Sequence, residues 1–419
     1  MTSFKDFGFD ERVLAKIAES GWESPTTIQK SMFNYVSNKR NVIAKARTGS
    51  GKTAAYALPL IDMTLKNRNN KSIVLVPSRE LIQQVFRMIK YLSPSDVYIY
   101  ELGDEAEAFS ETSLARSSSL TPDIIITTPT KLVKHIEAIK PSLELYKTIV
   151  IDEADLITTF GHAAALKKLV NFEELAAAQL ILLSATLDME DDELTELREI
   201  LNIKEPVILS LKSLPSQDRL RQFNVSCNEM DDKYLLLVAL LKLRLLTGKS
   251  LIFCNDVNTC FKVRLFLEQF GLKSVVLNAE MPYKSRLHTL AQFNKGSYDI
   301  MIASDETNMS VQDDKTSKSK TAQKDSKKHT KKLKEYSVAR GVDFNDVNNV
   351  LNFDLPISIE QYIHRVGRTA RGEFSTGIAL SFVHSLNDFN LVKKISEKCE
   401  ILAQPFAFKV EEISGLRHG

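Results

Sequence analysis

Short runs of apolar residues recur along the chain, and stretches with helical character separate them. Runs of this length, rich in Val, Ile and Leu, are typical of parallel strands buried on both faces. In the first half we predict strands at Asn41–Ala46, Ser72–Val76, Val97–Glu101, Asp123–Thr127, Thr148–Ile151 and Leu180–Ser184. In the second half we predict strands at Gln222–Cys227, Ser250–Asn255, Ser274–Leu277, Asp299–Ser304, Val347–Phe353 and Gly377–Phe382. The alternation predicts an α/β fold of doubly wound parallel sheets.

The alternation fades over Lys204–Gln217, where Pro206 and Pro215 flank a short extended segment. A chain of 419 residues is also too long for one ordinary hydrophobic core, so two domains are expected. The predicted organisation is a first domain at 1–210, a linker at 211–221, a second domain at 222–406 and a tail at 407–419.

One segment of the second half departs from this pattern. Glu306–Val338 is rich in Lys, Ser, Thr, Asp and Gln, and its nine Lys against five Asp and Glu give a local charge of +4. Such a segment buries too little apolar surface to offset its ordering entropy, so we predict disorder over 306–338. Its basic run at 327–332 is compatible with a nuclear address, an RNA tether or a plain solvated linker.

Composition narrows the function classes only modestly. The formal net charge is +2, so any charge that binds nucleic acid has to be local. The sequence has neither the apolar core of a signal peptide nor an apolar run that could cross a bilayer, so we expect no membrane partner. The four cysteines have no metal-ligand spacing and are expected to be reduced and buried.

The segment Ala46–Thr53 has the pattern of a phosphate-binding loop, since it follows a predicted strand and precedes a helix rich in Ala and Leu. Gly49 and Gly51 allow backbone N–H groups to turn toward phosphate oxygens, and the helix N-terminus favours anions. Lys52 can reach the β- and γ-phosphates of ATP, and the Thr53 hydroxyl can bind Mg²⁺. The predicted nucleotide contacts are Ala46, Arg47, Thr48, Gly49, Ser50, Gly51, Lys52 and Thr53.

Two acidic residues, Asp152 and Glu153, follow the predicted strand Thr148–Ile151. In a sheet of this class they emerge beside the phosphate loop. Asp152 can hold Mg²⁺, a hard cation that prefers carboxylate, water and phosphate oxygens. Glu153 can orient or deprotonate the attacking water, so we predict an ATPase site.

The motif Asp152-Glu153-Ala154-Asp155 completes a wider pattern, and the chain resembles the DEAD-box RNA helicase family from about Phe4 to Phe406. The resemblance implies two tandem RecA-like domains that use ATP and Mg²⁺ to separate RNA strands. It implies that Phe4 stacks on adenine and that Gln29, in Gly21–Gln29, reads the adenine edge. It also implies residues that couple the state of ATP to the domains: Asp155, Ser184 and Thr186.

RNA contacts are implied in both domains, through loops that hold the sugar–phosphate backbone. In the first domain they are Pro77, Arg79, Gly103, Thr128 and Lys131. In the second domain they are Arg286, Ser304, Arg340 and Gly341.

The segment His364–Arg371 resembles the arginine motif of the same family. Arg368 and Arg371 would donate to the γ-phosphate as charge develops, so hydrolysis would require the domains to close. His364 would link the γ-phosphate side to the acidic motif, and Asp343 would contact the ribose.

The sequence departs from the family pattern at several places. Asp256 stands where a phosphate-binding Thr is usual, Asn278-Ala279 replaces a common His-Gly, and Tyr283 stands where Gln is common. The motif that begins at Ser304-Asp305 resumes only at Ala339-Arg340. Such an insertion resembles a nucleolar subgroup active in large ribosomal subunit assembly. This implies a monomer in the nucleus and nucleolus that acts on pre-rRNA with pre-ribosomal assembly proteins.

Two other functions use the same kind of scaffold. A DNA translocase is less compatible with the Gln29 element and with the Arg368 and Arg371 pattern. A non-catalytic RNA clamp would tolerate the loss of Lys52 or Glu153, and both are present.

Overall fold

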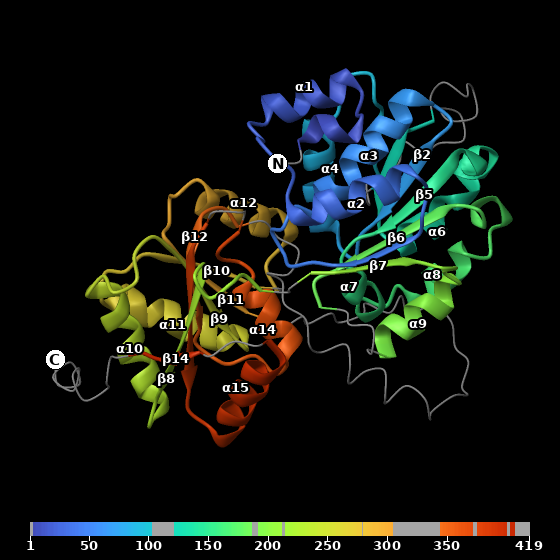
Figure 1. Cartoon of the computed structure of the whole chain (residues 1–419). Coiled ribbons are helices and arrows are strands. Elements are labelled where there is room, and N and C mark those ends of the chain that lie inside the picture. Colours follow the sequence, from blue (N-terminus) through green and yellow to red (C-terminus); the bar gives the residue numbers. More distant parts are fainter. Residues whose placement is uncertain are drawn as a thin grey trace, which may run out of the picture. The chain divides into compact units, whose positions relative to one another are not determined.

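The computed structural model describes residues 3–102, 121–186, 192–211, 214–278, 280–304, 344–371, 375–399 and 403–406. The chain forms two compact units, Met1–Ser213 and Leu214–Gly419 (Figure 1). Among the described residues, each unit holds one seven-stranded sheet, and every strand pair is parallel. The predicted α/β fold is therefore confirmed.

Unit 1 places its strands in the order β3-β4-β2-β5-β6-β1-β7. These strands are β1 (Val42–Lys45), β2 (Lys71–Leu75), β3 (Ile99–Glu101), β4 (Ile124–Thr127), β5 (Tyr146–Ile151), β6 (Gln179–Ser184) and β7 (Val207–Ser210). The α-helices of this unit are α1 (Glu11–Glu19), α2 (Thr27–Ser37), α3 (Lys52–Lys66), α4 (Arg79–Leu92), α6 (Pro129–Ile139), α7 (Ala154–Thr159), α8 (Ala163–Leu169) and α9 (Asp192–Leu201). Three short 3-10 helices accompany them: η1 (Phe4–Phe7), η3 (Lys140–Leu145) and η4 (Glu173–Leu175).

Alternate residues of the unit 1 strands point to two separate cores, because successive side chains of a strand face opposite sides of a sheet. On β1, Val42 and Ala44 join the core under α1, α2, α3 and α4. Ile43, between them, joins the other core, under α6, α7, α8 and α9. The strands are thus buried on both faces, which explains why they read as continuous apolar runs.

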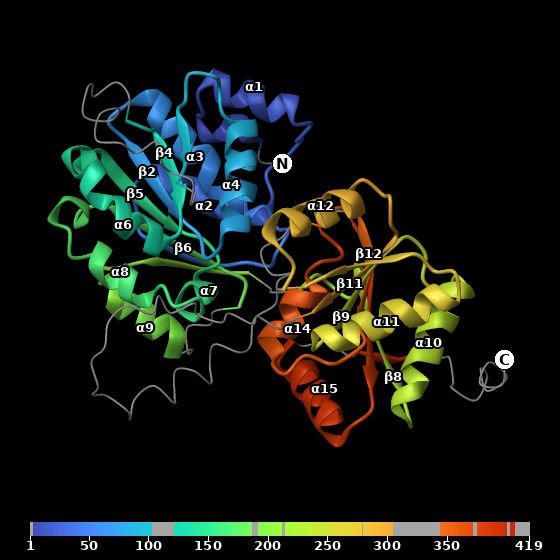
Figure 2. The same cartoon turned by 180° about the vertical axis from the view of Figure 1, so that it is seen from behind.

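Unit 2 repeats the plan with the strand order β10-β11-β9-β12-β13-β8-β14. Its strands are β8 (Leu220–Ser226), β9 (Lys249–Cys254), β10 (Ser274–Leu277), β11 (Ile300–Ser304), β12 (Val347–Asn352), β13 (Gly377–Val383) and β14 (Gln404–Pro405). Its helices are α10 (Met230–Lys242), α11 (Val257–Gln269), α12 (Tyr283–Asn294), α14 (Ile359–Val366) and α15 (Leu386–Cys399). Figure 2 shows α10 and α11 on one face of this sheet, with α12, α14 and α15 on the other.

All twelve predicted strands are present, with ends within three residues of the predicted ones. Two further strands, β7 and β14, escaped the sequence analysis. β7 pairs with β1 at the edge of the sheet and begins directly after Pro206, within the segment where the alternation fades. β14 has two residues and pairs with β8. Among the described residues, no helix is long and apolar enough to cross a membrane.

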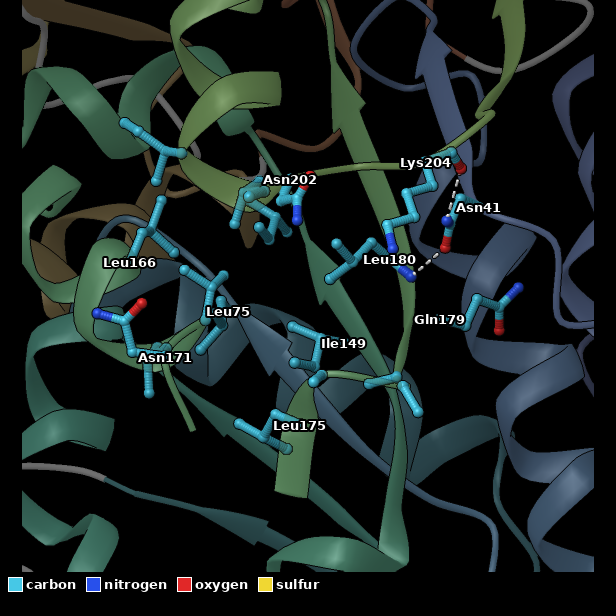
Figure 3. A pocket seen from close by; sticks show the side chains of 18 of the residues that line it. Asn41, Leu75, Ile149, Leu166, Asn171, Leu175, Gln179, Leu180, Asn202 and Lys204 are labelled. Carbon is cyan, nitrogen blue, oxygen red and sulfur yellow. Dashed lines mark hydrogen bonds between the residues drawn. The ribbon is translucent and has the colours of Figure 1, made fainter. Parts of the chain in front are cut away.

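A cavity of about 770 Å³ lies in unit 1 between the sheet and the layer of α8 and α9 (Figure 3). Apolar side chains such as Ile149, Leu166 and Leu175 line it. Asn41 closes one side by accepting a hydrogen bond from Leu180 N and donating one to Lys204 O, each at 2.9 Å. None of the predicted site residues lines this cavity.

Candidate functional site

The predicted motifs of unit 1 lie in a row along one edge of its sheet. Parallel strands end at the same edge, and the pairing of Lys45 with Ser184 and of Ile151 with Leu75 aligns their carboxyl ends. Along that edge the order is β4, β2, β5, β6 and β1. The loops that follow these strands therefore run from the predicted RNA contacts at one end to the phosphate loop at the other.

The phosphate loop has the backbone that its glycines predict. Gly49 has φ +75° and Gly51 has φ +92°, both in the left-handed region that favours glycine. α3 begins at Lys52, with Gly51 as its N-cap. The Ser50 hydroxyl donates to Arg47 O at 2.7 Å, which closes the turn. The first N–H groups of an α-helix have no acceptor within the helix, so the start of α3 suits an anionic phosphate.

Gln29 and Thr26, at the start of α2, hold the end of this loop. The Thr26 hydroxyl donates to Ser50 O at 2.8 Å, and Gln29 Nε2 donates to Gly51 O at 3.4 Å. Gln29 Oε1 accepts from Thr26 N at 2.9 Å. Gln29 is only 3% exposed, so it positions the phosphate loop in addition to the adenine contact predicted for it. Thr26 was not among the predicted site residues.

Phe4 lies in the core beside α2. Its ring stands 6.5 Å from that of Trp22 and 6.3 Å from that of Phe33, measured between centroids. Phe4 is only 4% exposed, so apolar packing fixes this ring. Its stacking on adenine stays a prediction.

Replacing Gly51 by alanine is expected to weaken ATP binding by about tenfold or more. A Cβ at this position would lie 2.7 Å from Gln29 Nε2, and the left-handed backbone would be strained as well. Titration with a fluorescent ATP analogue measures the change. Gly271→Ala is the matched control, because Gly271 has φ +70° and nothing within 4 Å of a built Cβ. Equal affinities for the two variants would contradict the role of this close contact.

The acidic motif faces the phosphate loop. Lys52 Nζ lies 3.2 Å from Glu153 Oε1, and both residues are buried. The Tyr56 hydroxyl donates to Asp152 Oδ2 at 3.0 Å, and Glu153 N donates to Asp152 Oδ1 at 2.9 Å. Burial, with the adjacent charge of Glu153, raises the pKa of Asp152 to about 6. Tyr56, which lies one turn beyond Thr53 on α3, was not among the predicted site residues.

These residues fit a magnesium ion by their chemistry. The Asp152 carboxylate and the Thr53 hydroxyl are oxygen ligands of the kind that Mg²⁺ prefers. Tyr56 lies beside this carboxylate and donates a hydrogen bond to it. Glu153 Oε2 is buried and makes no hydrogen bond within the described part of the chain, which suits a water held for attack. Glu153 also has φ +49°, a strained backbone often found at functional sites.

The predicted coupling residues form one chain of hydrogen bonds. The Thr186 hydroxyl donates to Asp155 Oδ2 at 2.8 Å, and Thr186 N donates to Ser184 Oγ at 3.1 Å. Ser184 O accepts from Ala46 N, the first residue of the phosphate loop, at 3.0 Å. The acidic motif is therefore joined to the phosphate loop through the end of β6.

The predicted RNA contacts of unit 1 that the structure describes, Pro77, Arg79, Thr128 and Lys131, lie at or next to two helix N-termini. Ser78 caps α4, accepting at 3.3 Å from Leu81 N, and Arg79 is the first residue of that helix. Thr128 caps α6, accepting at 3.4 Å from Lys131 N. Backbone N–H groups at helix N-termini, together with Arg and Lys side chains, suit the phosphates of a nucleic-acid backbone.

The arginine motif of unit 2 lies at the end of α14. Arg368 Nε donates to His364 O at 3.2 Å, and Arg371 Nε donates to Gly367 O at 3.4 Å. Ala370, between the two arginines, has φ +51°. Each of the two arginine side chains is thus held through Nε by a backbone carbonyl four residues earlier in the chain.

A third arginine of this motif, which was not predicted as a site residue, ties the loops after β9 and β12 together. Arg365 donates to Asp354 O at 2.6 Å and to Asn255 Oδ1 at 2.7 Å. Its guanidinium also lies 5.2 Å from the centroid of the Phe253 ring. Asp256, the residue that departs from the family pattern, caps α11 by accepting from Thr259 N at 2.8 Å.

Only some of the other motif residues of unit 2 lie within the described part of the chain. Arg286, on α12, lies 6.0 Å from the ring centroid of Tyr283. Asn278 Oδ1 accepts from the backbone of Glu280 and of Met281 at 3.1 Å. Ser304 is the last residue of β11 and its side chain is buried. Outside the described residues lie Gly103, Arg340, Gly341 and Asp343, the insertion 306–338 and the tail 407–419.

Comparison with known proteins shows the family to which this chain belongs. Residues 26–194 match the family described as DEAD/DEAH box helicase, and residues 232–373 match the helicase conserved C-terminal domain. The ATP-dependent RNA helicase dbp9 of Schizosaccharomyces pombe is 36% identical, over 99% of this chain and 78% of its own length. DBP9 of Debaryomyces hansenii is 38% identical, over 100% of this chain and 78% of its own length.

Solved structures share the fold. S. cerevisiae Dbp5 bound to RNA and ADP BeF3 superposes with a TM-score of 0.76, at 22% identity, over 100% of this chain and 98% of its own. Mss116p bound to ssRNA and AMP-PNP gives a TM-score of 0.75 at 21% identity, over 98% of this chain and 80% of its own. At these identities the likeness concerns the fold.

Proposed function

Because this chain belongs to the DEAD-box family of ATP-dependent RNA helicases, like its relatives named DBP9, we propose how its residues divide the work. The observation that carries the proposal is the buried contact of Lys52 with Glu153 beside Asp152. It joins a phosphate-binding cation to two carboxylates, and these are the groups that hydrolysis of a phosphoanhydride requires.

In unit 1, Lys52 binds the β- and γ-phosphates, and the N–H groups of the phosphate loop surround them. Thr53 and Asp152 would hold Mg²⁺, Asp152 through water, and the bound ion would supply positive charge near the phosphate oxygens. Glu153 orients the attacking water and accepts its proton. Gln29 holds the phosphate loop while it reads adenine.

In unit 2, Arg368 and Arg371 donate to the γ-phosphate as negative charge develops on it, with His364 beside them. ATP and RNA each favour the closed state of the two units, so each strengthens the binding of the other. A strand bent to fit the closed state cannot remain in an A-form duplex, and local strand separation follows. Hydrolysis then reopens the units and releases the strand.

The substrate proposed for this monomer is pre-rRNA, within large ribosomal subunit assembly in the nucleolus. Support comes from the position of the insertion 306–338 between Ser304-Asp305 and Ala339-Arg340, as in the nucleolar subgroup that the chain resembles. Crosslinking in cells followed by sequencing of the bound RNA tests this. Enrichment of pre-rRNA and of assembly proteins in the same particles is expected, and enrichment of messenger RNA alone would contradict it.

RNA-stimulated ATP hydrolysis is the test of the coupling. Saturating RNA is expected to raise kcat at least about tenfold, whereas DNA of the same sequence leaves it near its basal value. Lys52→Ala should abolish hydrolysis in both cases and thereby exclude a contaminating ATPase. Equal hydrolysis with and without RNA would contradict the coupling, and equal stimulation by DNA would favour a DNA translocase. Absence of turnover in every condition would favour the clamp.

A further inference from the structure

One side chain in unit 1 joins the two predicted RNA loops. His162 directly precedes α8, and its two ring nitrogens face residues of different elements. Nδ1 lies 2.7 Å from the Thr130 hydroxyl in the first turn of α6, and Nε2 lies 3.0 Å from Pro77 O, just beyond β2. The three residues are far apart in sequence, so only the fold brings them together.

The partners of His162 determine which nitrogen carries the proton. Pro77 O can only accept, so Nε2 is the donor in that contact. In the neutral imidazole, Nδ1 then accepts a hydrogen bond from the Thr130 hydroxyl. Burial, with the nearby charge of Lys131, lowers the pKa of His162, which agrees with the neutral form.

The two contacts bear on the residues that would face RNA. Pro77 immediately precedes Ser78 and Arg79 at the start of α4, and Thr130 immediately precedes Lys131 at the start of α6. β2 and β4, which lead into these helices, pair directly, with Leu75 opposite Thr127. Fixing both loops to a common imidazole therefore sets the distance and orientation between the two helix N-termini. α6 and α8 also pack together on the same face of the sheet (Figure 2).

We propose that His162 is a positioning residue for RNA, which holds the Pro77–Arg79 and Thr128–Lys131 loops at the spacing required by neighbouring phosphates of one strand. The proposal rests on the proposed function, since it assumes that these loops bind the RNA backbone. His162 itself contacts neither RNA nor ATP. Its effect should therefore appear in the affinity for RNA and leave the chemical step unchanged.

The test replaces His162 by phenylalanine, which keeps a ring of similar size and removes both hydrogen bonds. The KM for RNA in the ATPase reaction and the Kd for a single-stranded RNA are expected to rise roughly fivefold or more. ATP affinity without RNA and kcat at saturating RNA should stay within about twofold of wild type. His162→Gln, whose amide can donate to Pro77 O and accept from Thr130, should restore part of the affinity.

Two further variants separate positioning from general stability. Thr130→Val removes one hydrogen bond without touching His162, so it should raise the Kd for RNA by a smaller factor. In the double variant the two effects should not add, because they remove the same contact. His384→Phe is the matched control in unit 2, where it removes an imidazole contact with Cys227 O at 3.2 Å and should leave RNA affinity unchanged.

Each outcome bears on a different claim. If wild-type protein binds RNA and His162→Phe binds it equally well, the positioning role is wrong while the helicase function stands. If His162→Phe weakens ATP affinity as much as RNA affinity, His162 supports the whole unit, and the proposal is overturned. If wild-type protein does not bind RNA, the proposed function fails and this inference fails with it. Should His162→Phe not fold, Thr130→Val and its RNA affinity decide the question.

Discussion

Glu153→Gln is expected to slow ATP hydrolysis at least about 100-fold while ATP binding stays close to that of wild type. Glutamine keeps the volume of the side chain, and its amide oxygen can still accept from Lys52, whose Nζ lies 3.2 Å from Glu153 Oε1. The amide cannot take a proton from water at neutral pH, so only the chemical step is lost. Lys52 and the phosphate loop remain to bind the nucleotide.

Two measurements check this separation of binding from chemistry. Single-turnover hydrolysis with saturating RNA gives the rate of the chemical step, and titration with a fluorescent ATP analogue gives the affinity. Glu173→Gln is the matched control, because Glu173 is exposed in η4 and has no predicted role. Hydrolysis by Glu153→Gln at near the wild-type rate would mean that another group activates the water.

The parts of the site that could be predicted from the sequence alone are formed by residues close to one another in the chain. The phosphate loop needs only a strand, two glycines and a helix within a short segment, and Gly49 and Gly51 adopt the positive φ that glycine permits. The strands could also be predicted from local sequence, because burial on both faces makes each of them a continuous apolar run. β7 was missed because it starts directly after a proline, within a segment that resembles a linker.

The parts that escaped prediction depend on contacts between residues distant in sequence. Tyr56 and Asp152 are 96 positions apart, and their hydrogen bond exists only because α3 packs beside the end of β5. His162 and Pro77 are 85 positions apart. A tyrosine in an apolar helix or a histidine before a helix carries no such signal by itself. Their roles appear only once the carboxyl ends of the strands are aligned.

Gln29 differs from these residues. It was predicted from the sequence as an adenine contact, and the structure shows that it also holds the phosphate loop. Its amide was predicted to face adenine, since it offers a donor and an acceptor. In the structure, Oε1 accepts from Thr26 N and Nε2 donates to Gly51 O. Loss of Gln29 would therefore disturb the phosphate loop as well as base recognition, so a weaker affinity for ATP alone cannot separate the two.

Arg368→Ala is expected to lower ATP hydrolysis about 1000-fold in the presence of RNA, with little change in ATP affinity when RNA is absent. In the proposed mechanism, the phosphate loop of unit 1 provides the ground-state contacts, whereas the guanidinium acts on charge that develops during the reaction. Arg368 is held for this task by the bond from Nε to His364 O and by the Phe344 ring, 6.0 Å from its guanidinium.

Arg368→Lys shows whether charge alone is sufficient. Lysine keeps the positive charge but has no planar fork, so it cannot donate to a backbone carbonyl and a phosphate in the same fixed geometry. We therefore expect it to recover no more than about tenfold of the lost rate. Arg264→Ala, at an exposed position on α11, is the matched control and should hydrolyse ATP at the wild-type rate. If Arg368→Ala also hydrolysed ATP normally, unit 1 would be a complete ATPase, and the closed state of the two units would serve RNA binding alone.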